Sequence, residues 1–479
     1  MGQTLPVVLT FALYTLFVLG VGIYATKFTK TMEDFFLAGR RLGAWVTAIS
    51  SVASSESGWV VLGLVGIAYK EGMSAVWIAP GCLLGYVANW YLLAFRLRRE
   101  SKGLGALTVP DFLEAKAKDH SHLVRTVAVV ITFFCMMGYV GAQFNAAGKT
   151  FDAVFKISYL NGVLLGAVIT IVYTLLGGFR AVSWTDLLQG LMMVFGLIFL
   201  PVVAVIHLGG LGNLLQGLSQ QSPSLLTLTG DKVGFALLGL IIGYLGIGLG
   251  YPGQPHVITR YMAVRGEREI RRSRFIAITW GILVYYGAIF LGLAGRLILP
   301  QIADPEYTYP TVALRLLPPV IAGVMLAAIT SAIRSTADSQ LLVAASSVAR
   351  DVYQKVFRKE ADQKRLVLTS RLTVLILGLL SLFLAMTRSR VVFWFVLFAW
   401  SGLGASFGPP ILFSLYWKRT SKWGIVAGMI VGFATTMIWK LTGLSSRTIY
   451  ELVPAFILSA LAVILGSLLT KGKAKVSSA

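Results

Sequence analysis

The chain has 479 residues, of which 56% are hydrophobic and only 13% are charged. This composition excludes an ordinary soluble globular domain, and apolar windows of about 20 residues, each long enough to cross a bilayer as a helix, recur along the chain. The net charge of +22 does not indicate nucleic-acid binding, because the Lys and Arg residues lie in short loops between apolar windows, where they orient a membrane protein.

The apolar windows predict an all-α integral membrane protein with about 13 transmembrane helices and no separate soluble domain. The predicted spans are 4–25, 43–69, 75–97, 124–150, 159–178, 183–207, 233–262, 275–299, 317–349, 366–386, 391–417, 423–441 and 449–470. The two cysteines of the chain define neither a metal site nor a disulfide framework.

Basic residues gather in alternate loops, which predicts the orientation of the chain. The basic loops contain Lys27, Lys30, Arg40 and Arg41; Arg96, Arg98, Arg99 and Lys102; Arg265, Arg268, Arg271, Arg272 and Arg274; Lys355, Arg358, Lys359, Lys364 and Arg365; Lys418, Arg419 and Lys422; and the tail from Lys471 to Lys475. We expect that side to be cytoplasmic, with the N-terminus outside the cell and the C-terminus inside.

Two spans carry helix-breaking residues near their middle. The second span has a run of serines between Ile49 and Trp59 that ends in Gly58, and the hydroxyls of such a run compete for backbone hydrogen bonds. The seventh span has two prolines and several glycines between Gly243 and Pro255, which should unwind a helix. Irregular backbone is tolerated at membrane depth only where it is buried or lines a cavity.

The two broken spans are five spans apart, which predicts two inverted repeats that each open with a discontinuous helix. The repeats would cover residues 43–207 and 233–417. The first helix and its loop, 1–42, would precede them, and two C-terminal helices with the basic tail, 423–479, would follow, all within one transmembrane domain. In such folds the substrate binds at the breaks near the middle of the membrane.

Charged and hydroxyl residues interrupt the ninth span between Ala328 and Gln340. Helical spacing places Ser335, Thr336 and Ser339 on one face, with Arg334 and Asp338 one turn apart on the neighbouring face. A row of hydroxyls beside a carboxylate is hard oxygen chemistry, which suits a small alkali cation. Charges inside a membrane are costly, so they indicate a functional site.

Long ordered motifs run through nearly the whole chain. They are Asp34–Arg40, Ser57–Trp59, Ala106–Phe112, Gly177–Asp186, Gly250–His256, Ser335–Thr336, Gln340–Val343, Trp400–Pro409 and Val426–Met429. By these motifs the chain resembles the sodium/solute symporter family, and within it the bacterial sodium/proline symporters. The resemblance implies a LeuT-like core of ten helices in two inverted repeats, with one helix before the core and two after it.

The resemblance also implies where ions would bind. A sodium site would use backbone carbonyls and two hydroxyls; its residues would be Ala53, Glu56, Ala332, Ser335 and Thr336. A second cation site, present in some members, would take Asp186, Ser335, Asp338 and Ser339. Taken alone, Ser335 and Thr336 could instead hydrogen-bond to carbonyls of their own helix, and Asp186 could be a charge in the first turn of a helix.

Substrate contacts implied by the resemblance are Tyr139, Ile247, Tyr251 and Pro255, together with the unwound residues Ser55, Glu56, Ser57 and Gly58. Gln254 offers an amide to a substrate carboxylate, or it satisfies the backbone freed by the break. The chain departs from the proline symporters in having Ser55 where they have Asp, and Ile247 where they have Trp. Arg334 beside the hydroxyls is a further departure.

Three charges in two neighbouring spans lead to a specific hypothesis. In this hypothesis, a charge network around the sodium site is formed by Glu56, Arg334 and Asp338. Alternatively, Asp338 simply neutralises Arg334, since burial makes such pairing nearly obligatory.

Together these features predict a sodium-coupled secondary symporter that imports a small amino acid, proline first among them, by alternating access. We expect no enzyme activity, because the sequence has no phosphate-cradling loop, no nucleophile–base pair and no Cys/His metal cluster. The alternatives are a proton-coupled or sodium-independent amino-acid symporter that uses Glu56 and Arg334, and a symporter of the same family with another substrate. A ligand sensor and a channel are further alternatives, which uptake and current measurements would distinguish.

Overall fold

A computed structural model describes residues 4–28, 31–176, 178–357, 362–386 and 391–471. Its regular structure is helical throughout these residues, apart from one isolated parallel bridge between Leu42 and Val264. The predicted all-α class is therefore confirmed. The predicted basic residues Lys30, Arg358 and Lys359, and the tail beyond Lys471, lie outside the described residues.

The helices of the first half are α1 (Thr4–Thr26), α2 (Met32–Leu37), α3 (Ala44–Ser55), α4 (Val65–Glu71), α5 (Ile78–Ala88), α6 (Ala94–Gly103), α7 (Val109–Ala117), α8 (Leu123–Phe155), α9 (Tyr159–Leu176), α10 (Phe179–His207) and α11 (Leu211–Gln221). Those of the second half are α12 (Gly234–Gly246), α13 (Pro255–Ala263), α14 (Glu267–Ile298), α15 (Thr308–Leu316), α16 (Pro319–Ser346), α17 (Gln363–Met386), α18 (Val392–Tyr416), α19 (Lys422–Leu441), α20 (Leu444–Arg447) and α21 (Leu452–Lys471). Tighter or wider helical turns join them: η1 (Ala38–Arg40), η2 (Trp59–Leu64), η3 (Gly72–Trp77), η4 (Asn89–Leu93), η5 (Pro223–Leu226), η6 (Ile247–Gly253), η7 (Pro305–Tyr307) and η8 (Ser347–Phe357).

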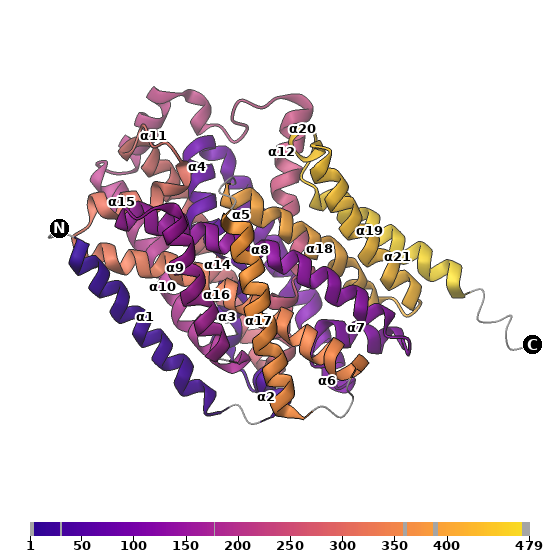
Figure 1. Ribbon diagram of the computed structural model, residues 1–479. Helices are drawn as coiled ribbons and strands as arrows, with labels where there is room; N and C mark the ends of the chain where they lie inside the picture. The colour runs from indigo at the N-terminus through magenta and orange to yellow at the C-terminus, as the bar shows by residue number, and fades with distance from the viewer. Residues whose placement is uncertain (1–3, 29–30, 177, 358–361, 387–390, 472–479) are drawn as a thin grey trace, which may run out of the picture.

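Long helices cross the molecule between two ends (Figure 1). Helices α11, α12 and α20 lie at one end, and α2 and α6 lie at the other, where the basic loops are. Among the described residues, eleven helices are long and apolar enough to cross a membrane, and α9 is a shorter apolar helix. The chain is thus a multi-pass membrane protein, while the count of thirteen spans stays a prediction.

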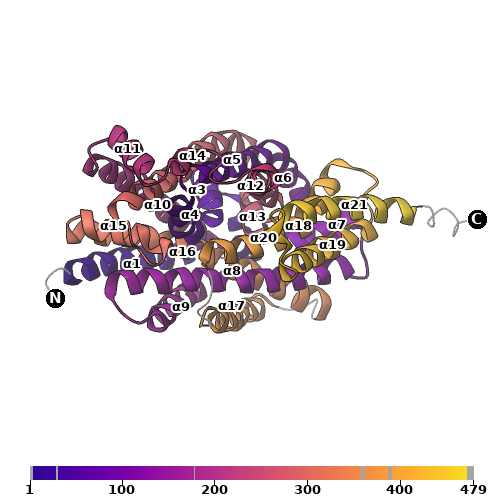
Figure 2. The same ribbon diagram turned by 90° about the horizontal axis from the view of Figure 1, so that it is seen from above.

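The helices divide into an inner group and an outer group. In α16 and α18, 83% of the most apolar window is buried, whereas in α1 only 22% is buried. Seen from above, α3, α4 and α16 lie toward the middle, with α1, α9 and α17 along one side (Figure 2). Large apolar side chains such as Leu13 on α1 and Phe383 on α17 are exposed, as expected where a helix faces lipid rather than water.

Buried ion pairs fasten the basic end of the molecule. The Arg125 guanidinium, near the start of α8, pairs with Asp351 at 2.6 Å and with Asp111 at 2.7 Å, and it also pairs with Glu114. The three carboxylates come from α7 and η8, so this one arginine holds three elements together. Nearby, the Arg40 guanidinium donates to the carbonyls of Ala106 and Met262.

A second set of ion pairs, which we call the Lys149–Glu306 lock, joins elements at the opposite end of the molecule. The Lys149 ammonium near the end of α8 lies 2.6 Å from carboxylate oxygens of both Asp304 and Glu306. The Glu306 carboxylate also accepts hydrogen bonds from the backbone N–H groups of Val392 and Phe393, at 3.0 Å each. A carboxylate at the start of a helix is favourable because it satisfies free N–H groups and faces the positive end of the helix dipole. Glu306 therefore ties α8 to the start of α18.

Candidate functional site

The first predicted break is present in the structure. Helix α3 ends at Ser55, and Glu56 adopts an extended conformation with φ −97° and ψ 104°. The backbone freed by the break finds partners nearby: the Gly58 N–H donates to Gln143 Oε1 on α8 at 3.1 Å, and the Trp59 ring N–H donates to the Ser55 carbonyl at 3.0 Å. The break is thus a built feature whose polar groups are satisfied by side chains, as membrane depth requires.

The second predicted break is also present. Between α12 and α13 the chain forms η6, and Gln254 then adopts an extended conformation before Pro255 starts α13. The Gln254 amide donates to the carbonyls of Gly250 at 3.2 Å and of Trp400 at 3.0 Å. Glycine is required here, since a Cβ on Gly250 would lie 2.0 Å from the ring nitrogen of Trp400. Gln254 thus satisfies backbone carbonyls at the break, while its role toward a substrate stays a prediction.

Four of the five residues predicted for a sodium site meet between α3 and α16. The Ser335 hydroxyl donates to the Ala53 carbonyl at 2.8 Å and to the Ala332 carbonyl at 3.3 Å. The Thr336 hydroxyl reaches the same Ala53 carbonyl at 3.3 Å. All four residues are fully buried. Glu56, the fifth predicted residue, caps the end of α3 three positions after Ala53. Ser335 therefore does more than bond to its own helix, which was the simpler interpretation.

The carboxylate of Glu56 lies among tyrosines rather than arginines. Its Oε1 accepts hydrogen bonds from the hydroxyls of Tyr86 at 2.7 Å, Tyr251 at 2.8 Å and Tyr285 at 2.5 Å. The Ser55 hydroxyl donates to the same atom at 3.2 Å. We call Glu56 and these three tyrosines the tyrosine box. The three tyrosines come from α5, η6 and α14, so the Glu56 carboxylate is directed toward those elements.

The predicted charge network of Glu56, Arg334 and Asp338 is not formed. Among the described residues, no carboxylate lies within 4.0 Å of the Arg334 guanidinium. That guanidinium instead lies 5.6 Å from the centre of the Tyr173 ring. The physical reason is geometric: Glu56 is held by the tyrosine box, and Asp338, one turn along α16, makes no direct contact with Arg334.

An arginine that the sequence analysis did not single out occupies the place predicted for a second cation. The Arg260 guanidinium, on α13, lies 3.0 Å from Asp186 Oδ2 and donates to the Ser339 hydroxyl at 2.5 Å and to the Ser50 hydroxyl at 3.0 Å. Asp338 is fully buried nearby. Asp186 and Ser339 are thus brought together as predicted, but around a side chain of this protein.

The predicted substrate residues lie around the two breaks. The rings of Tyr251 and Trp400 meet edge to face at 4.7 Å, and the Tyr139 ring lies 5.8 Å from the His256 ring. Tyr139, Tyr251 and Pro255 are buried. Ile247 lines a cavity of about 380 Å³ that extends past Leu397 and Tyr450 to Glu71, Lys232 and Arg447. This cavity connects the second break with the end of the molecule opposite the basic loops.

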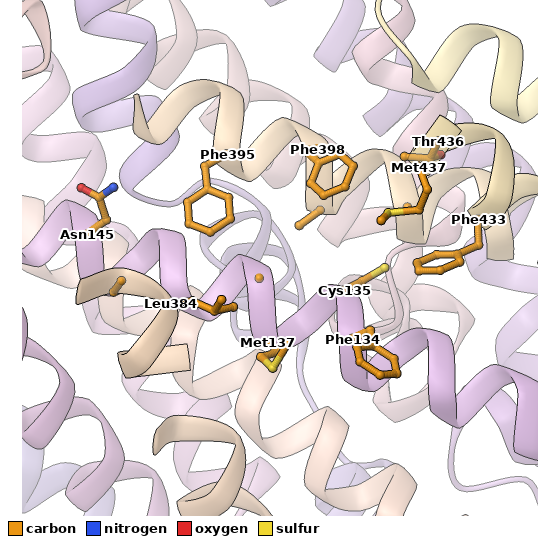
Figure 3. Close-up of a pocket in the computed structure, with 14 residues that line it drawn as sticks. Phe134, Cys135, Met137, Asn145, Leu384, Phe395, Phe398, Phe433, Thr436 and Met437 are labelled. Carbon is orange, nitrogen blue, oxygen red and sulfur yellow. The ribbon is translucent and has the colours of Figure 1, made fainter. Parts of the chain in front are cut away.

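A second cavity, of about 300 Å³, lies apart from the breaks, between α8, α17, α18 and α19 (Figure 3). The side chains of Phe134, Phe395, Phe398 and Phe433 are among its lining. With Asn145 and Thr436 as the polar side chains of its lining, it suits an apolar occupant and not a charged solute.

Some residues of the site could have been found from the sequence and others could not. Arg260 lies inside a predicted span, so the rule that singled out Arg334 also applies to it. Tyr86 and Tyr285 carried no such signal, because a tyrosine in an apolar helix is more often a packing residue. Only the way the helices are rotated in the structure brings these hydroxyls to Glu56.

Comparison with known proteins agrees with this architecture. The profile of the sodium:solute symporter family matches residues 35–432. The chain is 38% identical over 481 residues to the osmoregulated proline transporter OpuE of Bacillus subtilis, covering 99% of this chain and 97% of that protein. It is 38% identical to the sodium/proline symporter of Escherichia coli, covering 98% of this chain and 94% of that one.

A solved structure supports the fold. A Na⁺-coupled sialic acid symporter in a substrate-bound, outward-open state superposes with a TM-score of 0.77 at 18% identity, covering 97% of this chain and 98% of that one. This likeness confirms the predicted LeuT-like class of fold. On the family profile and the near full-length relatives, the chain belongs to the sodium:solute symporter family.

Proposed function

We propose that this protein is a sodium-coupled symporter that imports proline across a bacterial inner membrane. The observation that carries the proposal is the meeting of the Ser335 and Thr336 hydroxyls with the Ala53 and Ala332 carbonyls at the first helix break. Proline is the first candidate substrate because the relatives that match nearly the whole chain are named proline transporters.

Sodium is the coupling ion that this donor set suits. A hard cation prefers oxygen ligands, and the cluster offers two hydroxyls and two backbone carbonyls, with the Glu56 carbonyl as the proposed fifth ligand. The ion would join α3 to α16 more strongly than the present hydrogen bonds do. Sodium binding would thereby favour one arrangement of the two helices over the other.

Proline would bind between the two breaks. The aromatic faces of Tyr139, Tyr251 and Trp400 are suited to a pyrrolidine ring, and the Glu56 carboxylate is suited to its ammonium group. Because the tyrosine box engages Oε1 of Glu56, the Oε2 atom, which has no hydrogen-bond partner among the described residues, remains for that ammonium. The Gly58 N–H, which donates to Gln143 Oε1 in this structure, would exchange that partner for the substrate carboxylate.

Transport would proceed by alternating access between two inverted repeats, 43–207 and 233–417, around this midplane site. With the N-terminus outside and the basic loops in the cytoplasm, the cavity lined by Ile247 and Tyr450 would open to the exterior. The Lys149–Glu306 lock would then lie on the outer side and the Arg125 cluster on the inner side. Each is placed to hold one face closed while the other opens.

The test is uptake of labelled proline into proteoliposomes under an inward sodium gradient, an inward proton gradient, or neither. Uptake driven by sodium alone supports the proposal. Uptake that is insensitive to sodium refutes sodium coupling. No proline uptake under any gradient, from protein that still binds sodium, refutes proline as the substrate and makes Ile247 the first position to examine in a wider screen.

Proton coupling is a second candidate function, which one observation favours. Glu56 is fully buried and bonded to three neutral hydroxyls, without a cationic partner within 4.0 Å among the described residues. A carboxylate in such surroundings is a natural proton carrier. The proton-gradient arm of the same experiment distinguishes the two candidates.

A further inference from the structure

The Arg260 guanidinium lies where a second cation would otherwise be held. It reaches from α13 into the space between α3, α10 and α16, where it contacts Asp186, Ser50 and Ser339 at 3.0, 3.0 and 2.5 Å. Its remaining nitrogen donates to the carbonyl of His256 on its own helix. The Arg260 side chain is fully buried, so these contacts replace water entirely.

More buried oxygen atoms surround Arg260 than its guanidinium can hydrogen-bond. The second oxygen of Asp186 and both oxygens of Asp338 are buried, and among the described residues they accept no hydrogen bond. The Ser54 hydroxyl lies 3.1 Å from that of Ser339 and 3.4 Å from Asp186. Two buried carboxylates beside a set of hydroxyls form the kind of site that binds a hard cation, and unpaired buried carboxylates are costly.

The buried charges in this region support a definite ion count. Glu56, Asp186 and Asp338 are acidic, and Arg260 and Arg334 are basic; all five are 4% exposed or less. If all are ionised, they leave one net negative charge, which a single sodium ion would balance. Without the charge of Arg260 the excess becomes two negative charges, and a second ion would be needed.

We propose that Arg260 is a tethered cation that fills a latent second sodium site formed by Asp186, Asp338, Ser54 and Ser339, and so limits the protein to one sodium ion. Neutralising Arg260 then exposes a site at which a second sodium binds. This inference rests on the proposed function, because it takes the Ser335 cluster as the site of the first ion.

The test is equilibrium binding of radiolabelled sodium to the purified full-length protein, with Arg260→Gln as the informative variant. Wild type is expected to bind one ion per chain and Arg260→Gln two, because the glutamine keeps a polar group but removes the charge. Arg260→Lys keeps the charge and is the matched control, with one ion expected. Arg260→Gln combined with Asp338→Asn is expected to return to one ion.

Equal binding by wild type and Arg260→Gln overturns the inference, as does a gain of one ion in Arg260→Lys. Thermal unfolding in sodium and in choline covers the case of an unstable variant. Arg260→Gln should be stabilised by sodium more strongly than wild type, and a variant that unfolds equally in both salts contradicts the inference. Failure of the proposed function has a different signature: wild type binds no sodium, while Arg260→Gln still gains one ion over it.

Discussion

The Ser335 hydroxyl lies 2.8 Å from the Ala53 carbonyl, which joins the middle of α16 to the last turn of α3 just before that helix breaks. Both residues are fully buried. The contact places a hydroxyl and a backbone carbonyl at the one point of α3 where the helix leaves its last carbonyls free. The predicted coupling between ion and substrate depends on this point, because the residues that follow in the chain belong to the proposed substrate site.

Replacing Ser335 by Ala is expected to weaken sodium activation of proline uptake. A hydrogen bond or ligand contact to a charged group contributes about 1.5–3 kcal/mol, so the sodium concentration for half-maximal uptake should rise about tenfold to a hundredfold. Ser346→Ala is the matched control: this serine is on the same helix and donates to the Leu342 carbonyl of that helix at 2.7 Å. An unchanged sodium dependence in Ser335→Ala would contradict the assignment.

Replacing Glu56 by Gln is expected to weaken proline binding more than sodium binding, because the backbone carbonyl of Glu56, the proposed sodium ligand, is kept. The amide oxygen can still accept from the three tyrosines, but the charge that would face the substrate ammonium is lost. The KM for proline should rise by about tenfold or more, in line with the loss of one charge-assisted hydrogen bond. The measurement is uptake kinetics with proline and sodium varied separately. A loss of sodium affinity at unchanged proline KM would show that the side chain serves the ion.

The variants Glu56→Gln and Arg334→Ala are expected to act independently. The tyrosine box holds Glu56, whereas Arg334 lies against the Tyr173 ring. Effects of residues without contact add in free energy to within about 0.5 kcal/mol. The measurement is a double-mutant cycle on the ratio kcat/KM for uptake. Recovery of transport in the double variant would contradict independence and would support the charge network predicted from the sequence.

Replacing Glu306 by Gln is expected to destabilise the protein more than replacing Asp304 by Asn. Both carboxylates pair with Lys149, but the Glu306 side chain is 3% exposed and that of Asp304 is 35% exposed. Glu306 also accepts from two N–H groups at the start of α18. We expect a loss of about 1–3 kcal/mol for Glu306→Gln and less than about 1 kcal/mol for Asp304→Asn, read as midpoints of thermal unfolding in detergent. Equal midpoints would contradict the proposed lock.

Features that depend on the local sequence were predictable. The serine run before Gly58 and the Gly/Pro run before Pro255 predicted both helix breaks, and the structure has them at those positions. The two breaks follow from backbone propensities alone. The resemblance to the symporter family implied that the hydroxyl pair Ser335–Thr336 lies beside the first break, and both hydroxyls contact the Ala53 carbonyl there.

Features that depend on how helices are rotated against one another were not predictable. Arg334 and Asp338 have the i, i+4 spacing of a helical ion pair, yet they form no ion pair within 4.0 Å in the described residues. Arg260 lies on α13 and reaches Asp186 on α10, more than seventy positions earlier in the sequence. A single sequence gives the spacing of charges along each helix, but not the neighbour that each charge meets.

Proline-dependent uptake of radiolabelled sodium into proteoliposomes tests the central claim most directly. Wild type should take up sodium when proline is added outside, in fixed proportion to the proline that enters, and Ser335→Ala should lose this response at sodium concentrations that suffice for wild type. Proline entry without accompanying sodium, or an undiminished response in Ser335→Ala, would contradict coupling through the Ser335–Ala53 contact.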